Sequence, residues 1–263
     1  MTEYKDLRII NNGEEISYTE VQHIAAKRAA HILQEMSELG ATLYLNDTEL
    51  DSNQIYTLSN TDILQACIES KKKLGRQGIL DLYSDKISQS RQMWHQIAEE
   101  SDGKTFKESH VTVEVDHIDP KIIAKKISSS SANDLNLEIA YRLSPDHFVF
   151  GLINNTQEVM ETIGHYKEPT WFRLEMAPDD LGPQKDPACI AAPKAQFVLD
   201  DGFRMPMFAM HQFYATPNGM RVELGSYFPS ATPDEVVIGH REHFTVEFGN
   251  NMAMALNQLH ANK

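Results

Sequence analysis

The chain has 263 residues, of which 41% are hydrophobic, enough to bury the core of one large domain or of two smaller ones. Its 38 acidic residues outnumber its 24 basic residues and give a formal net charge of −14, which argues against nucleic acid or an anionic membrane surface as a partner. The polar N-terminus, the lack of a long apolar run and the two cysteines without a CxxC spacing favour the cytoplasm. We therefore expect an acidic cytoplasmic protein that acts on a small molecule.

The first hundred residues show the pattern of amphipathic helices. Ser17 begins a capping-box motif, and apolar residues at helical spacing follow it as far as Gly40, where the helix is expected to end. Further helices are predicted from Thr61 and from Ser88. Because their apolar stripes need a partner surface, we expect residues 1–105 to form a helical domain packed against the rest of the chain. This domain would help to close a pocket or to build a homodimer, and it would carry no catalytic residue.

After residue 105 the pattern changes to short segments that are typical of strands. Asn218 and Gly219 stand at the turn of the clearest hairpin, and residues 203–207 are expected to form a loop. The predicted strands cover residues 110–115, 135–143, 147–153, 170–176, 195–199, 208–217 and 220–228.

The last part of the chain predicts one long helix. Thr232 is placed to cap it, and the helical pattern runs toward Leu259 with Gly239 and Gly249 inside it. Glycine costs about 1 kcal/mol in a helix interior, so these two glycines are expected to permit close packing or a bend. Several antiparallel strands followed by one helix predict an α+β fold in which a curved sheet wraps around the helix and leaves a cavity.

His243 and Glu247 lie four residues apart on this helix, so their side chains project from one face. Imidazole nitrogens and carboxylate oxygens are both ordinary zinc ligands, and the pair is suited to a divalent metal with an open coordination position. The same spacing also occurs in solvated histidine–glutamate contacts, so the pair alone leaves both interpretations open.

Several motifs follow one another through the second half of the chain: VMETIG (159–164) with FRLEMAPDDLG (172–182), MHQFY (210–214), NGMRVELGSYF (218–228) and HFTVEFGN (243–250). In this order they resemble the diacetylphloroglucinol hydrolase and phloretin hydrolase family, metal-dependent enzymes that cleave a carbon–carbon bond beside an aryl ketone. The resemblance covers residues 106–263 and implies that they form a catalytic domain of the helix-grip (Bet v 1-like) type.

The resemblance also implies a set of site residues. Glu161, His243 and Glu247 match the family's zinc ligands, although two carboxylates leave iron or manganese as alternatives. His211 matches an active-site histidine, which would protonate the leaving carbon or hold an oxygen of the substrate. His147 lies in a segment similar to the family's PEDHF stretch and is expected to have a structural or supporting role.

One ligand of the family has no counterpart in this sequence. In the family it is a histidine inside an aromatic-rich segment, and here the corresponding stretch holds four consecutive serines, 128–131. Asp134 or His117 is therefore the candidate for the fourth ligand, and the alternatives are a site of three ligands or no metal at all.

These observations predict a metal-dependent hydrolase that cuts a carbon–carbon bond in a phloroglucinol-like or 1,3-dicarbonyl substrate. An alternative is a ring-opening hydrolase of a cyclic 1,3-diketone, because the aromatic segment that would line an aryl-ketone pocket is missing. Another alternative is a non-catalytic helix-grip protein that holds a small apolar ligand in the same cavity. Either enzyme would have a small phenolic or diketone molecule as its partner.

Overall fold

The computed structural model describes residues 4–120, 137–153, 156–165 and 168–261. Within these residues, a nine-stranded antiparallel sheet has the order β2-β1-β5-β11-β10-β9-β8-β7-β6, and β3 pairs only with β4. The strands are β1 (Leu7–Asn11), β2 (Glu14–Ile16), β3 (Leu43–Leu45), β4 (Thr48–Leu50), β5 (Phe106–Asp116), β6 (His147–Ile153), β7 (Thr156–Glu161), β8 (Thr170–Met176), β9 (Lys194–Leu199), β10 (Arg204–Ala215) and β11 (Gly219–Pro229).

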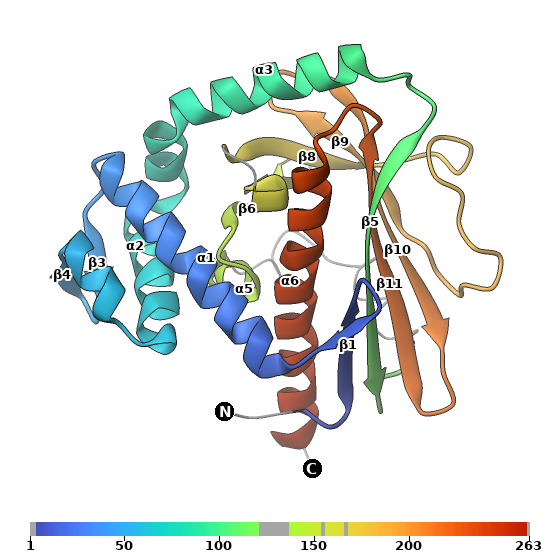
Figure 1. Ribbon diagram of the computed structural model, residues 1–263, viewed down its shortest axis with the longest axis horizontal. Coiled ribbons are helices and arrows are strands. Elements are labelled where there is room, and N and C mark those ends of the chain that lie inside the picture. The colour runs from blue at the N-terminus through green and yellow to red at the C-terminus, as the bar shows by residue number, and fades with distance from the viewer. Residues whose placement is uncertain (1–3, 121–136, 154–155, 166–167, 262–263) are drawn as a thin grey trace.

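The long C-terminal helix α6 stands between the sheet and the N-terminal helices α1 and α2 (Figure 1). None of the described helices is long and apolar enough to cross a membrane. The helices are α1 (Tyr18–Glu38), α2 (Asn60–Leu82), α3 (Ser84–Glu100), α5 (Leu137–Leu143) and α6 (Asp234–Ala261), with the 3-10 helices η1 (Ser52–Thr57) and η2 (Ile163–His165).

The helix starts follow from local capping. The Ser17 side chain accepts a hydrogen bond from the backbone N–H of Glu20, as the capping motif predicts, and Ser59 caps α2 in the same way through Asp62. The apolar face of α1 packs against α2, whereas α6 packs against β1 and β5. The structure thus confirms a mixed α/β fold with a large antiparallel sheet and a long C-terminal helix.

The prediction of a strand over residues 135–143 was wrong for its described part, because residues 137–143 form α5. Ala140 and Tyr141 are buried there, whereas Ile139 is 41% exposed, so Leu137, Ala140 and Tyr141 share one helical face. A short apolar run fits a helix face about as well as a strand, and spacing alone does not separate the two.

The loop expected over residues 203–207 was also wrong, since β10 begins at Arg204. Met205 and Met207 are fully buried and alternate with Pro206, as in a strand. The register of β10 against β9 shifts between Arg204 and Phe208, and such an irregularity accommodates a proline that cannot donate to the ladder.

The N-terminal part is not purely helical. β1 and β2 join the large sheet beside β5, with Ile9 opposite Val113, because Leu7 and Ile9 alternate as buried residues of a strand. The described part of residues 1–105 therefore contributes helices and also the strands β1 and β2 at one edge of the large sheet. A domain boundary at residue 105 stays a prediction.

Candidate metal centre

Two acid–base side chains come from one hairpin. β6 begins at His147 and β7 ends at Glu161, and these two residues are partners in the antiparallel ladder. Side chains that face each other across a ladder lie about 4.5–5.5 Å apart at Cβ, so the hairpin register alone brings this imidazole and this carboxylate together.

The other two side chains come from α6. His243 and Glu247 are one helical turn apart, and the distance between His243 Nε2 and Glu247 Oε2 is 3.4 Å. The backbone of α6 lies against η2, which follows β7 in the chain. The pair on the helix therefore lies next to the end of the hairpin.

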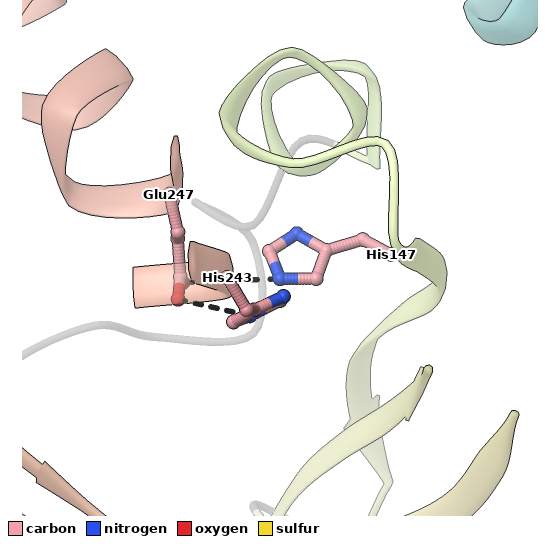
Figure 2. A group of neighbouring side chains, drawn as sticks. All are labelled: His147, His243 and Glu247. Carbon is pink, nitrogen blue, oxygen red and sulfur yellow. Dashed lines mark ion pairs between the residues drawn. The ribbon is translucent and has the colours of Figure 1, made fainter. Parts of the chain in front are cut away.

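The four side chains form one cluster in which each imidazole lies close to both carboxylates. His147 Nε2 lies 3.7 Å from Glu161 Oε2 and 3.9 Å from Glu247 Oε1, and His243 Nε2 lies 3.7 Å from Glu161 Oε2. One ligand atom each of His147, His243 and Glu247 fall within 4.8 Å of one another (Figure 2). Ligand atoms around a tetrahedral zinc ion are separated by about 3.3–3.6 Å, given bonds of about 2.0–2.2 Å. The distances from the two imidazoles to Glu247, 3.4 and 3.9 Å, are close to this value, and the group of three must contract from at most 4.8 Å to hold a metal ion.

The hydrogen bonding of His147 fits a metal ligand. Its Nδ1 lies 2.9 Å from the carbonyl oxygen of Ala140, to which it donates, so the lone pair of the neutral ring is on Nε2. That Nε2 is buried and has no hydrogen-bond partner among the described residues. A carbonyl that fixes the tautomer and orientation of an imidazole, while its other nitrogen is free, is the usual arrangement behind a metal-bound histidine.

The electrostatics of the cluster favour a cation. His147 and His243 are 1% exposed and Glu161 is 6% exposed, so two carboxylates and two imidazoles share a desolvated space. Burial raises the pKa of Glu161 to about 7 against the opposing charge of His243. Desolvation alone would lower the pKa of His243, but the carboxylates of Glu161 and Glu247 raise it to about 9. Without a metal, a proton on His243 offsets part of the negative charge, and a divalent ion would take over that role.

A cavity of about 320 Å³ adjoins the cluster. Glu161, His243 and Glu247 form part of its wall, whereas His147 contacts the cluster but does not line the cavity. Most of the remaining wall is apolar, and its aromatic members are Phe150, Phe172, Phe197, Phe244 and Phe248. A small molecule in this cavity would therefore have its polar end at the cluster and an apolar or aromatic body in contact with phenyl rings.

His211 faces this cavity from β10, with its ring centroid 5.5 Å from that of Phe244 and 5.2 Å from that of Phe248. Burial lowers the pKa of His211 to about 4, so the ring is neutral at pH 7. Its Nδ1 is buried and has no hydrogen-bond partner among the described residues, which leaves it free to bond an oxygen of a bound molecule.

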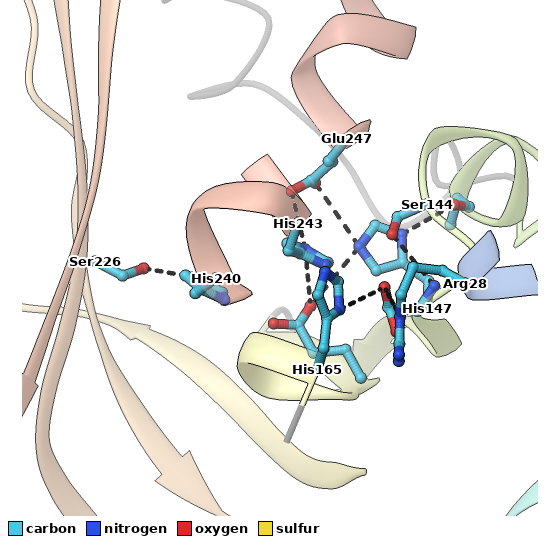
Figure 3. A network of polar contacts seen from close by, with 11 residues as sticks. Arg28, Ser144, His147, His165, Ser226, His240, His243 and Glu247 are labelled. Atoms are coloured by element: carbon cyan, nitrogen blue, oxygen red, sulfur yellow. Dashed lines mark hydrogen bonds and ion pairs between the residues drawn. The ribbon is translucent and has the colours of Figure 1, made fainter. Parts of the chain in front are cut away.

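His240 is buried, and its ring is stacked on that of His243 with centroids 5.2 Å apart. Its Nε2 lies 3.0 Å from the Ser226 hydroxyl, as Figure 3 shows, so His240 has a protein partner and is not solvated. His165 adopts a left-handed backbone conformation (φ 56°) beside Gly164. Its Nδ1 lies 3.2 Å from Asp146 Oδ2.

The structure brings together the expected ligands Glu161, His243 and Glu247, but the fourth member of the cluster is His147. His117 lies in a left-handed turn after β5, where its N–H donates to the carbonyl of Asn218, and it does not belong to the cluster. Asp134 lies outside the described residues. His147 was expected, from the resemblance of its segment, to have only a structural or supporting role. Its position opposite Glu161 was missed because β7 was not predicted as a strand, so its pairing with β6 could not be foreseen.

Comparisons with models of known protein families and with curated proteins give no match to this chain. The resemblance to the diacetylphloroglucinol hydrolase family therefore depends on the order of the short motifs and on the ligand set that they imply.

Proposed function

We propose that this protein is a metal-dependent hydrolase that cleaves a carbon–carbon bond in a ketonic substrate of the acyl-phloroglucinol or 1,3-dicarbonyl type. The observation that carries the proposal is a group of two imidazoles and one carboxylate that could hold a metal ion, with a second carboxylate, that of Glu161, beside both imidazoles, at the wall of a largely apolar cavity. His147, Glu161, His243 and Glu247 would hold the ion. Zinc suits this mixed donor set, and two carboxylates also suit iron or manganese.

The family and the finer fold assignment belong to the same proposal. A large antiparallel sheet beside a long C-terminal helix is the arrangement that a helix-grip fold requires, and the cavity lies between α6 and the strands. Fold alone does not assign an activity, so the weight rests on the site.

The chemistry of the reaction explains this donor set. A bound divalent ion lowers the pKa of water toward about 7 and polarises a ketone oxygen. In the overall reaction, water supplies a hydroxyl group to the acyl carbon and a proton to the carbon that leaves. The carbon–carbon bond breaks because its electron pair delocalises into an enolate or a hydroxylated ring. The products are a carboxylic acid and the deacylated ketone or phenol.

The residues of the chain would orient the substrate for this reaction. The phenyl rings of Phe172, Phe197 and Phe244 would contact the substrate body and exclude bulk water from the reacting carbonyl. His211 is neutral, so it is better suited to donate an Nδ1–H hydrogen bond to a substrate oxygen than to act as a cationic acid. A hydrogen bond of this kind would stabilise the negative charge that develops as the carbon–carbon bond breaks.

The observations that motivated the two alternatives point less strongly to them in the folded chain. The missing histidine suggested a non-catalytic binding protein, but His147 supplies a fourth donor. The missing aromatic segment suggested a non-aromatic ring as substrate, but phenylalanines from several other strands and from α6 line the cavity.

Metal analysis and a paired substrate assay test the proposal. The protein purified without chelator should retain a divalent metal near one ion per chain, and Glu247→Gln should lose both metal and activity. Glu235→Gln changes an exposed glutamate in the first turn of the same helix and should retain both. Acyl-phloroglucinols and cyclic 1,3-diketones should be assayed side by side. Turnover of only the diketones would favour the ring-opening hydrolase. A metal-free protein that turns over neither substrate would contradict both enzymes and favour the non-catalytic binding protein.

A further inference from the structure

Lys71 is a fully buried lysine that contacts the segment preceding the cluster. It belongs to α2, and its Nζ donates to the carbonyl oxygens of Pro145 and His147, the latter at 2.7 Å. The ammonium also lies 4.4 Å from the ring centroid of Phe148 and 5.3 Å from that of Tyr141. All of these partners belong to the short stretch of chain around His147.

A buried ammonium is costly unless its donors are satisfied. Removing such an ion from water costs several kcal/mol in a folded protein, and an apolar side chain of similar length would fill the same core position at less cost. Among the described residues, no ion pair joins Lys71 to a carboxylate, and its nearest partners are the two carbonyls, the two rings and the thiol of Cys67, one turn earlier on α2. The more distant carboxylate of Asp146 also favours the charged form. The presence of a lysine is thus explained by the backbone that it holds.

A second cation from the N-terminal helices holds the residue between those two carbonyls. Arg28 on α1 donates to Asp146, with Nη2 2.7 Å from Oδ1, and Asp146 is itself buried. Two helices therefore hold the three residues 145–147 through one cation each, the buried Lys71 and the partly buried Arg28. The imidazole of His147 is held in addition by its hydrogen bond to Ala140.

We infer that Lys71 is a positioning residue for the metal centre: it fixes the backbone of His147, so that the free Nε2 stays at ligand distance from Glu161, His243 and Glu247. This inference rests on the proposed metal site but on no particular substrate. The helix α2 would then influence the metal affinity and the geometry of the site although it contributes no ligand. This is a role beyond the expected one of closing the pocket. Loss of a group that orients a ligand typically weakens metal binding about 10–100-fold.

Lys71→Met tests the inference, because it removes the two donors and retains an unbranched side chain. Lys73→Met is the matched control on the same helix, because Lys73 is partly exposed and contacts Asp47 and the Tyr44 ring instead of the segment around His147. Zinc affinity is measured by competition with a chromophoric chelator, the ligand field by the absorption of the Co²⁺ form, and stability by thermal unfolding of the metal-free protein. Lys71→Met should bind zinc about 10–100-fold more weakly and change the Co²⁺ spectrum. Lys73→Met should match the wild type in both.

The possible failures are distinguishable. If Lys71→Met unfolds at a lower temperature but has wild-type zinc affinity and a wild-type Co²⁺ spectrum, Lys71 only stabilises the fold and the inference is wrong. If the wild type itself binds neither ion, the proposed metal site fails and the inference fails with it. Lys71→Gln keeps a shorter donor and serves where the methionine variant does not fold. It should show an intermediate affinity, and unaltered binding in this variant would likewise overturn the inference.

Discussion

Gly164 and Gly239 meet backbone to backbone: a Cβ atom on Gly239 would lie 2.0 Å from the carbonyl oxygen of Gly164. Gly164 follows shortly after Glu161, and Gly239 precedes His243 by one turn of α6. The contact therefore places α6 directly against the end of the β6–β7 hairpin. The carboxylate of Glu161 and the imidazole of His243 can approach to 3.7 Å because no side chain separates the two backbones.

Gly239→Ala should accordingly push α6 away from η2. Overpacking of this kind costs about 1–3 kcal/mol, even though alanine is the better helix former, and zinc affinity should fall with it. Gly78→Ala is the matched control, since its Cβ would meet Leu74 at 3.4 Å, an ordinary contact, and should be neutral or stabilising. Urea unfolding and chelator competition measure the two effects. A Gly239→Ala protein as stable and as tight in zinc binding as the wild type would contradict the role given to this contact.

His147→Ala should remove a metal ligand and not merely a supporting group. The loss in zinc affinity should therefore exceed the roughly 10–100-fold that is typical when a group behind a ligand is lost. His95→Ala is the control, because His95 is partly exposed on α3 and pairs with Asp201. Metal content after dialysis and the dissociation constant for zinc are the measurements. Retention of stoichiometric, tight zinc by His147→Ala would exclude it from the ligand set.

Metal removal should lower the stability of the wild type. A ligand that binds only the folded state stabilises it by about 2.7 kcal/mol at a free concentration of 100 times the dissociation constant. Thermal unfolding with and without a chelator measures this shift, and added zinc should restore it. Glu247→Gln should show little response to either treatment. An equal response of both proteins would place the bound metal elsewhere.

His211→Gln should reduce turnover of the substrate without loss of the metal. The side chain lines the cavity, and its Nδ1 is available for a substrate oxygen, so kcat should fall by about 10²–10³-fold, as when a single stabilising donor is removed. Steady-state kinetics and metal analysis of the same preparation separate the two effects. If activity is unchanged, His211 is only a wall residue of the cavity.

The stability of the protein should depend on pH through His211. Its pKa is about 4 in the folded protein and near 6.5 in an unfolded chain, so the unfolded state binds more protons between these values. The contribution of His211 to stability should be complete above about pH 6.5, and about 1–3 kcal/mol of it should be lost as the pH falls toward 4. Urea unfolding of the wild type and of His211→Gln at pH 7 and pH 5 measures this contribution. The variant should lose less stability than the wild type on acidification, and parallel losses would contradict the shifted pKa.

Local patterns in the sequence predicted much of the scaffold and half of the site. The capping motif at Ser17 marks the start of α1, and the spacing of His243 and Glu247 places both on one face of α6, because helix geometry alone relates residues four apart. Glu161 was found through the resemblance of its motif. Local spacing failed for α5, where seven residues with an apolar face satisfy helix and strand patterns alike.

The sequence by itself thus determined which side chains have the chemistry to bind a metal and which of them share a helix face. Only the tertiary structure decided that His147 completes the group. Its partner Glu161 lies across a strand pair, and its orientation depends on a carbonyl from α5 and on cations from α1 and α2. These contacts join residues that are up to 118 positions apart, as between Arg28 and Asp146. No local periodicity relates such positions, and the packing of helices against the sheet creates their proximity.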